Sequence, residues 1–203
     1  DMKAARFYEK GKLVIDDVPV REPEADEVVI RIKYCGICGT DVHIFNGEKG
    51  SAEVHPPVIL GHEFSGDIER TGAAVTRFQK GDRVSVDPNA YCGKCYFCAN
   101  GKEHLCKHMT GLGTALDGGF AEYITVKEKL VYPVAEHVSY EAAAMTEPIS
   151  FCLHGLDLTG IKMGDTVMVV GTGNIGLIMV QLAKYAGAAT IIAVEPNEKR
   201  RKK

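Results

Sequence analysis

A cluster of four cysteines limits most strongly what this chain of 203 residues can form. Two consecutive C-x-x-C steps and one further cysteine lie in the stretch YCGKCYFCANGKEHLC, at Cys92, Cys95, Cys98 and Cys106. Four thiolates in one short loop can converge tetrahedrally on a single Zn²⁺, and such a shell leaves no position open for a substrate. Free thiols, a redox pair and an iron–sulfur cluster are the alternatives, but a redox pair needs only two cysteines and ferredoxins favour other spacings. The loop therefore predicts a structural zinc site.

The remaining composition favours a globular protein that keeps its cysteines reduced. The chain holds 7 cysteines, an odd number, and its opening DMKAARFYEKGKL lacks the apolar core of a secretory signal. We therefore expect metal ligands rather than disulfides, and a cytoplasmic location. A formal net charge of -3 and the lack of a long apolar run predict no nucleic-acid partner and no membrane contact. The basic run KRRKK is expected to be the solvated start of a helix.

The pattern of residue types changes near residue 140. Before it, the short runs KLVIDDVPV, EVVIRIKYC, DRVSVD and GGFAEYITV are rich in β-branched or aromatic residues and predict strands. Next, Ser139 is expected to be the N-cap of a helix. Farther on, TVMVV predicts a buried parallel strand, LIMVQLAKYAGA a helix ending at Gly187, and TIIAV a second buried strand. Strand, helix and strand form a βαβ unit, and we expect two domains, at residues 1–148 and 149–203.

The turn GTGNIG, between the first of these strands and the helix, predicts a dinucleotide site. Its glycines allow a tight turn, approach of the backbone to the pyrophosphate and close helix packing. The expected cofactor-binding residues are Gly171, Gly173, Asn174, Ile175, Gly176 and Glu195. Glu195, at the end of the next strand, should accept hydrogen bonds from the ribose and favour NAD over NADP. Arg200 and Arg201 weaken that preference, because nearby guanidinium groups could bind a 2′-phosphate.

A second set of candidate metal ligands is dispersed along the chain. Cys38 lies in YCGICGTDVH, His62 and Glu63 lie in LGHEFSG, and Glu147 lies in MTEPIS. Thiolate, imidazole and carboxylate all bind zinc, and a catalytic site typically takes three protein ligands and leaves one position for water. The spacing alone is weak support, so a surface His–Glu dipeptide and a small structural pair of Cys35 and Cys38 remain alternatives.

With these segments quoted, the chain resembles the zinc-containing medium-chain alcohol dehydrogenase family over essentially its whole length. In GHEFSGDIERTGAAV, the residues that fall on the family's zinc signature are Gly61, His62, Glu63, Gly66, Gly72 and Val75. The cysteine loop and the stretch DGGFAEY also match. The resemblance implies an α/β chain with a GroES-like, β-rich catalytic domain followed by an incomplete Rossmann dinucleotide-binding domain. It also implies that the full protein is a homotetramer or a homodimer.

The same resemblance assigns roles to the dispersed metal ligands. Cys38 and His62 look like ligands of a catalytic zinc ion, and Glu63 is similar to the neighbouring carboxylate that binds or approaches the ion. Glu147 stands where the sorbitol, threonine and butanediol dehydrogenase branches carry a glutamate.

Three further residues resemble the family's catalytic machinery. Asp41 resembles the carboxylate that orients the zinc-bound histidine, and Thr40 and His43 resemble the proton relay. The resemblance thus implies an oxidoreductase with two zinc ions per chain that transfers hydride from a secondary alcohol or sorbitol-like polyol to NAD, with NADP as the less favoured cofactor. L-Threonine or 2,3-butanediol dehydrogenase activity, or an inactive zinc-stabilised fragment, are the alternatives.

Overall fold

The chain forms two compact units in the computed structural model, which describes residues 1–48 and 53–202. The first unit runs from Asp1 to Met145, and the second begins at Thr146. The division lies close to the boundary expected between residues 148 and 149, whose place in the full protein stays a prediction. Within the described ranges, no helix is long and apolar enough to cross a membrane.

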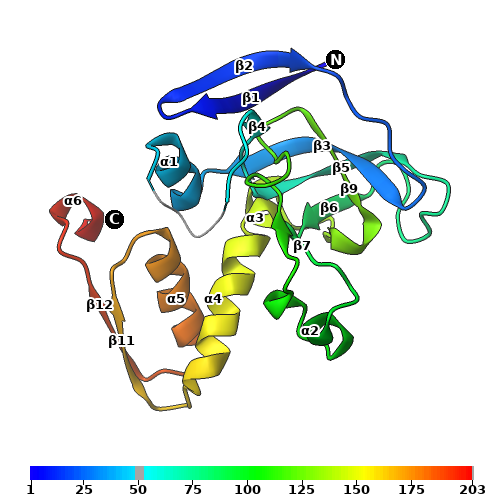
Figure 1. Cartoon of the computed structure of the whole chain (residues 1–203). Helices are drawn as coiled ribbons and strands as arrows, with labels where there is room; N and C mark the ends of the chain where they lie inside the picture. Colours follow the sequence, from blue (N-terminus) through cyan, green and yellow to red (C-terminus); the bar gives the residue numbers. More distant parts are fainter. Residues whose placement is uncertain (49–52, 203) are drawn as a thin grey trace. The chain divides into compact units, whose positions relative to one another are not determined.

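The main sheet of the first unit is antiparallel. In the described part of this unit, its strands follow the order β10-β6-β5-β3-β9 (Figure 1). The strands are β3 (Glu27–Gly36), β5 (Glu63–Thr71), β6 (Arg83–Val86), β9 (Tyr123–Lys127) and β10 (Val131–Pro133). The runs EVVIRIKYC and DRVSVD and the end of GGFAEYITV coincide with three of them, so these strand predictions are confirmed.

Smaller elements complete the first unit. A second antiparallel sheet has the order β2-β1-β4, and β7 pairs with β8. These strands are β1 (Met2–Glu9), β2 (Lys12–Val18), β4 (Val58–Ile59), β7 (Asn89–Ala90) and β8 (Thr110–Gly111). The helices are α1 (Gly39–Phe45), α2 (Tyr96–Ala99) and α3 (Tyr140–Ala144), with 3₁₀ turns η1 (Glu103–Leu105) and η2 (Glu128–Leu130). Ser139 caps α3 as predicted, since its hydroxyl oxygen accepts the Ala142 amide at 3.2 Å.

The core of the first unit lies along strands β3 and β5. Val28 and Ile30 of β3 and Phe64 and Ile68 of β5 are at most 1% exposed. Ile30 is paired with Ile68 across the sheet. A shift of one residue would turn this set of side chains to the other face, so burial specifies how the two strands pair.

The second unit contains the predicted βαβ arrangement. Strands β11 (Thr166–Val170) and β12 (Thr190–Val194) are parallel and are connected by α5 (Asn174–Tyr185). Helix α4 (Thr146–Thr159) packs against α5, and α6 (Glu198–Arg201) follows β12. Gly187, with φ of 95°, follows the last turn of α5, as expected for a helix end.

The prediction that TVMVV (β11) and TIIAV (β12) form buried strands is wrong for the described residues, since most of their side chains are exposed and the others are half-buried. Val169 lies on the face toward α5, whereas Met168 is 60% exposed and Val170 is 76% exposed. A continuous apolar run is typical of strands covered on both faces, and in the part of the chain that the structure describes α5 covers one face. The run therefore identified a parallel strand correctly but not its burial.

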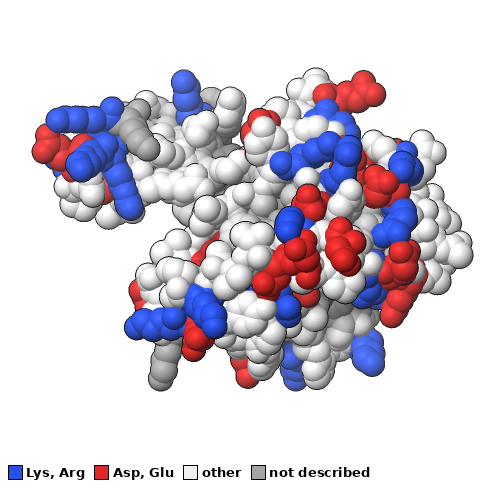
Figure 2. Space-filling view, turned by 90° about the horizontal axis from the view of Figure 1, so that it is seen from above, with Lys and Arg blue, Asp and Glu red and all other residues white. Residues whose placement is uncertain are grey.

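The surface carries charges of both signs. On the face shown in Figure 2, Lys and Arg side chains stand beside Asp and Glu side chains over much of the molecule. Lys127 illustrates this arrangement, since its ammonium group lies 2.8 Å from both Glu24 and Asp26. Much of the basic charge is therefore compensated by adjacent carboxylates.

Replacing Ile30 with alanine should destabilise the first unit strongly. The side chain is fully buried on an interior strand, and a cavity of this size typically costs about 2–5 kcal/mol. The midpoint of urea unfolding, followed by circular dichroism, should fall. The control Ile15→Ala, at a side chain 66% exposed on β2, should leave the midpoint nearly unchanged. Equal midpoints for Ile30→Ala and the wild type would contradict the placement of Ile30 in the core.

Candidate metal centres and cofactor site

The four cysteines of the loop converge on one point, and we call them the closed metal group. Cys95 Sγ lies 3.5 Å from Cys98 Sγ and 3.9 Å from Cys106 Sγ, and Cys92 Sγ lies 4.0 Å from Cys98 Sγ. A tetrahedron with Zn–S bonds of about 2.3 Å has sulfur–sulfur edges of about 3.8 Å. The spacing of the sulfur atoms therefore fits the ligand shell of a zinc ion.

The backbone of this loop favours negative charge on sulfur. Two backbone amides donate to Cys106 Sγ, at 3.4 and 3.3 Å. Hydrogen bonds from the backbone of Cys98 and of Lys107 lower the pKa of the Cys95 thiol to about 6. Because the thiolate is the form that binds metal, the loop holds Cys95 in its ligand state near neutral pH.

Three of the dispersed residues also lie together, and we call them the open metal group. The ligand atoms of Cys38, His62 and Glu63 all lie within 4.8 Å of one another. Cys38 is the N-cap residue of α1, and Glu63 is the first residue of β5. The two segments meet because Gly36, at the end of β3, pairs with Glu63. This donor set suits zinc, and three protein ligands leave a fourth position for a substrate oxygen.

The two cysteines that precede α1 have opposite properties. A hydrogen bond from His62 lowers the pKa of the Cys38 thiol below its usual value, against the effect of burial. Hydrogen bonds from Thr40 lower this pKa further. Burial raises the pKa of the Cys35 thiol to about 12, so Cys35 stays protonated. The electrostatics therefore favour Cys38 as a metal ligand over a structural pair of both cysteines.

Asp41 connects the segments that carry the open metal group. Its side chain is buried, and Oδ2 accepts the Cys38 amide at 2.8 Å. Its Oδ1 accepts the Gly61 amide at 3.2 Å and lies 3.7 Å from His62 Nδ1. The carboxylate thus holds the backbone on both sides of the group, a position compatible with the orienting role that remains predicted for it.

The two residues expected to relay protons lie on α1. Thr40 is half-buried next to Cys38, whereas His43 is exposed. His43 Nδ1 contacts Glu48 Oε2, and the same carboxylate accepts a hydrogen bond from Asn46 Nδ2 at 3.2 Å. Sequence analysis did not identify Glu48, because it lies beyond the end of α1 and its spacing from His43 follows no helical period.

The glycine-rich turn requires glycine at two points. Gly171 has φ of 88°, in the left-handed region that other residues rarely adopt. A Cβ atom on Gly176 would lie 1.8 Å from Gly171 O, so any side chain there would force α5 away from the turn. Gly173 is the N-cap residue of α5, and Asn174 and Ile175 begin the helix. The first amides of α5 therefore form an N-terminus of the kind that binds phosphate.

Glu195 is fixed by the turn that it follows. Its carboxylate is buried and accepts the Thr172 amide at 3.0 Å and the Asn197 amide at 2.9 Å. The hydrogen bond from Asn197 is the main reason that the pKa of Glu195 is lowered, so the carboxylate is ionised at neutral pH. The same residue that was expected to bind ribose thus also connects the turn to the end of β12, a second role that sequence analysis missed.

Glu147, the remaining predicted metal ligand, belongs to the second unit. It is half-buried in the first turn of α4. Burial and then the negative charge of Glu147 raise the pKa of the Cys152 thiol on the same helix. Its membership of the open metal group stays a prediction.

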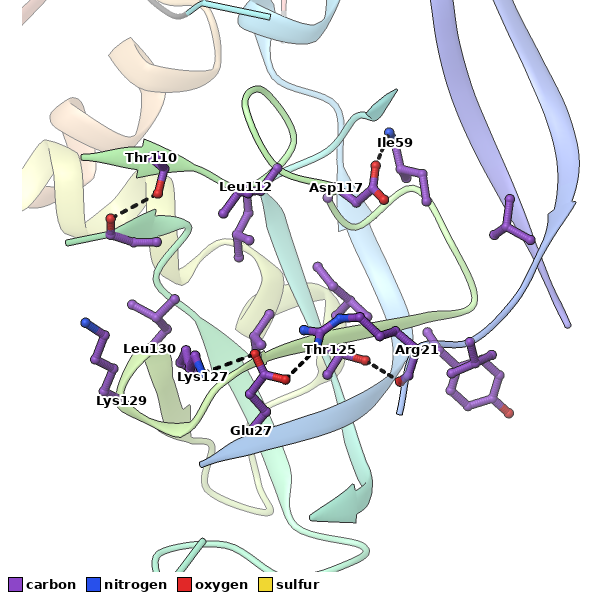
Figure 3. A pocket seen from close by; sticks show the side chains of 18 of the residues that line it. Arg21, Glu27, Ile59, Thr110, Leu112, Asp117, Thr125, Lys127, Lys129 and Leu130 are labelled. Carbon is purple, nitrogen blue, oxygen red and sulfur yellow. Dashed lines mark hydrogen bonds and ion pairs between the residues drawn. The ribbon is translucent and has the colours of Figure 1, made fainter. Parts of the chain in front are cut away.

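A cavity of about 760 Å³ lies elsewhere in the first unit (Figure 3). Apolar residues such as Met2, Ile59 and Leu112 line it, and the open metal group does not. Two charged side chains of its wall interact, since Arg21 Nη1 donates to Glu27 Oε2 at 2.7 Å. We assign no ligand to this cavity.

The chain matches known proteins along almost its whole length. Residues 24–136 match the family described as alcohol dehydrogenase GroES-like domain. Sorbitol dehydrogenase from Bacillus subtilis (strain 168) is 39% identical over 197 residues, which cover 96% of this chain and 56% of that protein. L-threonine 3-dehydrogenase from Bacillus licheniformis is 41% identical over 184 residues, which cover 90% of this chain and 53% of that protein.

Solved structures give the same result. 2R,3R-butanediol dehydrogenase from Bacillus subtilis superposes with a TM-score of 0.91 at 34% identity, over 100% of this chain and 60% of that one. A protein of Sinorhizobium meliloti 1021, described as a zinc-binding dehydrogenase and solved bound to NADP, superposes with a TM-score of 0.93 at 41% identity. That match covers 99% of this chain and 58% of the other.

The described residues thus form a β-rich unit with two groups of candidate metal ligands and a βαβ unit with a glycine-rich turn. The chain belongs to the zinc-containing medium-chain alcohol dehydrogenase family, which confirms the resemblance found in the sequence. It spans 56% of the length of the sorbitol dehydrogenase that it matches.

Replacing Asp41 with asparagine should destabilise the first unit even without metal. The two carboxylate oxygens accept two backbone amides, and an asparagine offers only one oxygen, so one buried amide loses its partner. Such a loss typically costs about 1–3 kcal/mol. Urea unfolding of the metal-free protein should show it. Asp82→Asn is the control, because Asp82 accepts one amide, from Gln79, in an exposed turn and should tolerate the change. A midpoint for Asp41→Asn equal to that of the control would contradict this account.

Proposed function

We propose that the full protein is a zinc-dependent dehydrogenase that transfers hydride from a secondary alcohol or polyol to a nicotinamide dinucleotide. The observation that carries the proposal is the open metal group, whose thiol, imidazole and carboxylate ligand atoms lie within 4.8 Å of one another. The closed metal group cannot serve this purpose, because four cysteines fill a tetrahedral shell. The donor set of the open metal group therefore favours a catalytic role. The donor set of the closed metal group favours a structural role.

The residues of the open metal group fit a zinc ion. Bound by Cys38, His62 and Glu63, zinc would supply a Lewis acid that lowers the pKa of a substrate hydroxyl. Asp41 holds the backbone amides beside Cys38 and at Gly61, which limits movement of the ligands. A fixed ligand set orients the substrate oxygen relative to the cofactor, and orientation of this kind contributes much of the rate enhancement of enzymes.

Proton transfer is proposed to run through α1. Thr40, beside the open metal group, would accept the proton of the substrate hydroxyl as its own hydroxyl proton moves on toward the exposed His43, which would release a proton to solvent. Glu48 contacts Nδ1 of His43 and so leaves Nε2 as the nitrogen that exchanges the proton. The carboxylate of Glu48 would thus fix the orientation of the imidazole.

The glycine-rich turn is proposed to bind NAD, with NADP less favoured. The first amides of α5 would hold the pyrophosphate, and Glu195 would accept hydrogen bonds from the ribose. An ionised carboxylate repels a 2′-phosphate, which is the basis of the preference. The Sinorhizobium meliloti protein bound to NADP shows that a relative takes the phosphorylated cofactor, and Arg200 and Arg201 could offer cationic partners here.

The substrate is proposed to be a sorbitol-like polyol. The relatives are named for sorbitol, L-threonine and 2R,3R-butanediol, and two of these substrates carry hydroxyl groups on adjacent carbons. Glu147 is proposed as the carboxylate ligand that alternates with Glu63, so that three protein ligands hold the ion and a fourth position stays open to the substrate. L-Threonine and 2,3-butanediol are the alternative substrates, and a substrate panel on the full protein distinguishes them. A homotetramer or homodimer in the cytoplasm remains the expectation from the sequence.

The full protein should bind two zinc ions per chain with different lability. Treatment with 1,10-phenanthroline should remove one ion and abolish NAD reduction, because three protein ligands and an exchangeable position leave the ion accessible. The second ion should stay bound in the wild type during this treatment. It should be lost in the variant Cys95→Ser. Metal content by mass spectrometry before and after treatment checks this. One resistant ion and no labile ion, in protein purified with added zinc, would contradict the open site.

Replacing Glu195 with glutamine should shift the cofactor preference toward NADP. The change removes the negative charge that opposes a 2′-phosphate while keeping the size of the side chain. It also leaves the Thr172 or the Asn197 amide without its acceptor, so the readout is the ratio between the two cofactors rather than the absolute rate. The ratio of kcat/KM for NADP to that for NAD should rise about tenfold, equivalent to about 1.4 kcal/mol. Glu198→Gln, at an exposed carboxylate on α6, is the control and should leave the ratio unchanged. An unchanged ratio in Glu195→Gln would show that Glu195 does not select the cofactor.

A further inference from the structure

Gly36 is the direct cross-strand neighbour of a proposed metal ligand. It is the last residue of β3 and pairs in antiparallel register with Glu63, the first residue of β5. Directly paired residues of an antiparallel sheet place their side chains on the same face, with Cβ atoms close together. A side chain at position 36 would therefore project beside Glu63, on the face that carries the open metal group.

The space that such a side chain needs is already occupied. A Cβ atom on Gly36 would lie 2.4 Å from Glu63 Oε2, 3.2 Å from Glu63 Cβ and 3.5 Å from Glu63 Cδ. The first distance is shorter than non-bonded atoms tolerate, so the carboxylate would have to move. Glu63 is 5% exposed, which leaves the displaced carboxylate little room to reach solvent.

Backbone conformation does not explain glycine at this position. Gly36 is not among the glycines with positive φ, so alanine is compatible with its backbone. Alanine also suits an extended strand better than glycine does, because glycine loses more conformational entropy on folding. The physical reason for glycine is therefore the proximity of the Glu63 carboxylate.

We propose that Gly36 is a positioning residue, whose missing side chain keeps open the space in which Glu63 faces Cys38 and His62. A methyl group there displaces the carboxylate and removes one of three ligands from the open metal group. The role rests on the proposed function, in that it assumes metal binding by this group. Gly36 acts only through Glu63. Its effect on metal binding can therefore be distinguished by experiment from general damage to the sheet.

Cobalt binding to the full protein tests the role without relying on turnover. Co²⁺ bound through a thiolate absorbs in the near-ultraviolet and visible range, so its affinity for the Cys38 site is measured by titration with a competing chelator. Gly36→Ala should lower this affinity by roughly 10–100-fold, the range typical when a group that orients a metal ligand is lost. Gly39→Ala is the matched control. Position 39 follows Cys38 and has no positive φ, and an added Cβ would meet nothing within 4 Å beyond its chain neighbours and the backbone of its own helix. It should bind cobalt as the wild type does.

A double-mutant cycle separates displacement of Glu63 from general disruption. Glu63→Ala should lower cobalt affinity itself, and adding Gly36→Ala to it should cause no further loss, because no carboxylate remains to be displaced. A Gly36→Ala variant with wild-type affinity would overturn the proposal, and so would an equal loss in both backgrounds. If Gly36→Ala alone does not fold, the double variant decides, because the clash is then absent. The proposal requires it to fold and to bind cobalt as Glu63→Ala does, and a double variant that stays unfolded overturns it.

The same titration distinguishes this proposal from the proposed function. A wild-type protein that gives no thiolate–cobalt absorption sensitive to Cys38→Ser would refute the open metal site, and the role of Gly36 with it. Cobalt binding in the wild type that is unaffected by Gly36→Ala would refute only the role of Gly36. Zinc content of the closed metal group, measured in every variant, reports whether the rest of the first unit is intact.

Discussion

The pairing of β3 with β5 is the constraint on which the proposed active site depends. Cys38 follows one strand, and His62 and Glu63 stand at the start of the other, so the ligands meet only if the strands keep their register. Burial of Ile30 opposite Ile68 fixes the register in the middle of the two strands, since a slip of one residue there would expose apolar side chains. The ladder is irregular between Ile32 and Tyr34, and such bulges commonly re-aim side chains beside functional sites. The same pair of strands therefore forms the core and positions the proposed metal ligands.

The two metal groups differ in how the protein builds them. In the closed group, backbone amides within the loop lower the pKa of the Cys95 thiol, whereas burial raises that of Cys98. In the open group, the pKa of Cys38 is lowered mainly by His62, which arrives from another segment. Asp41 then joins the two segments through the amides of Cys38 and Gly61. The open metal group is thus held by contacts between segments that are distant in the chain, as the proposed exchange of a substrate ligand would require.

In the glycine-rich turn, one residue, Glu195, has both a structural role and a proposed binding role. Glu195 accepts the Thr172 amide inside the turn and the Asn197 amide beyond β12, so its charge stabilises the turn before any cofactor binds. Arg201 donates to the carbonyl groups of Glu195 and Pro196, which orders the same segment. The proposed discrimination between cofactors and the shape of the turn therefore depend on the same carboxylate. The proposed NAD preference then depends on the local fold as well as on charge.

The sequence by itself determined the features that depend on short spacing. The cysteine loop, the cap at Ser139, the βαβ unit and the family were all evident, because their contacts join residues close in the chain or lie in one motif. Only the tertiary structure brought Cys38 to His62 and Glu63, placed Glu48 against His43, and left no room for a side chain at Gly36. Within the described residues, it also showed α5 against one face of the apolar run of β11. Contacts across strands and beyond helix ends are set by register and burial of the whole unit, and local spacing does not encode them.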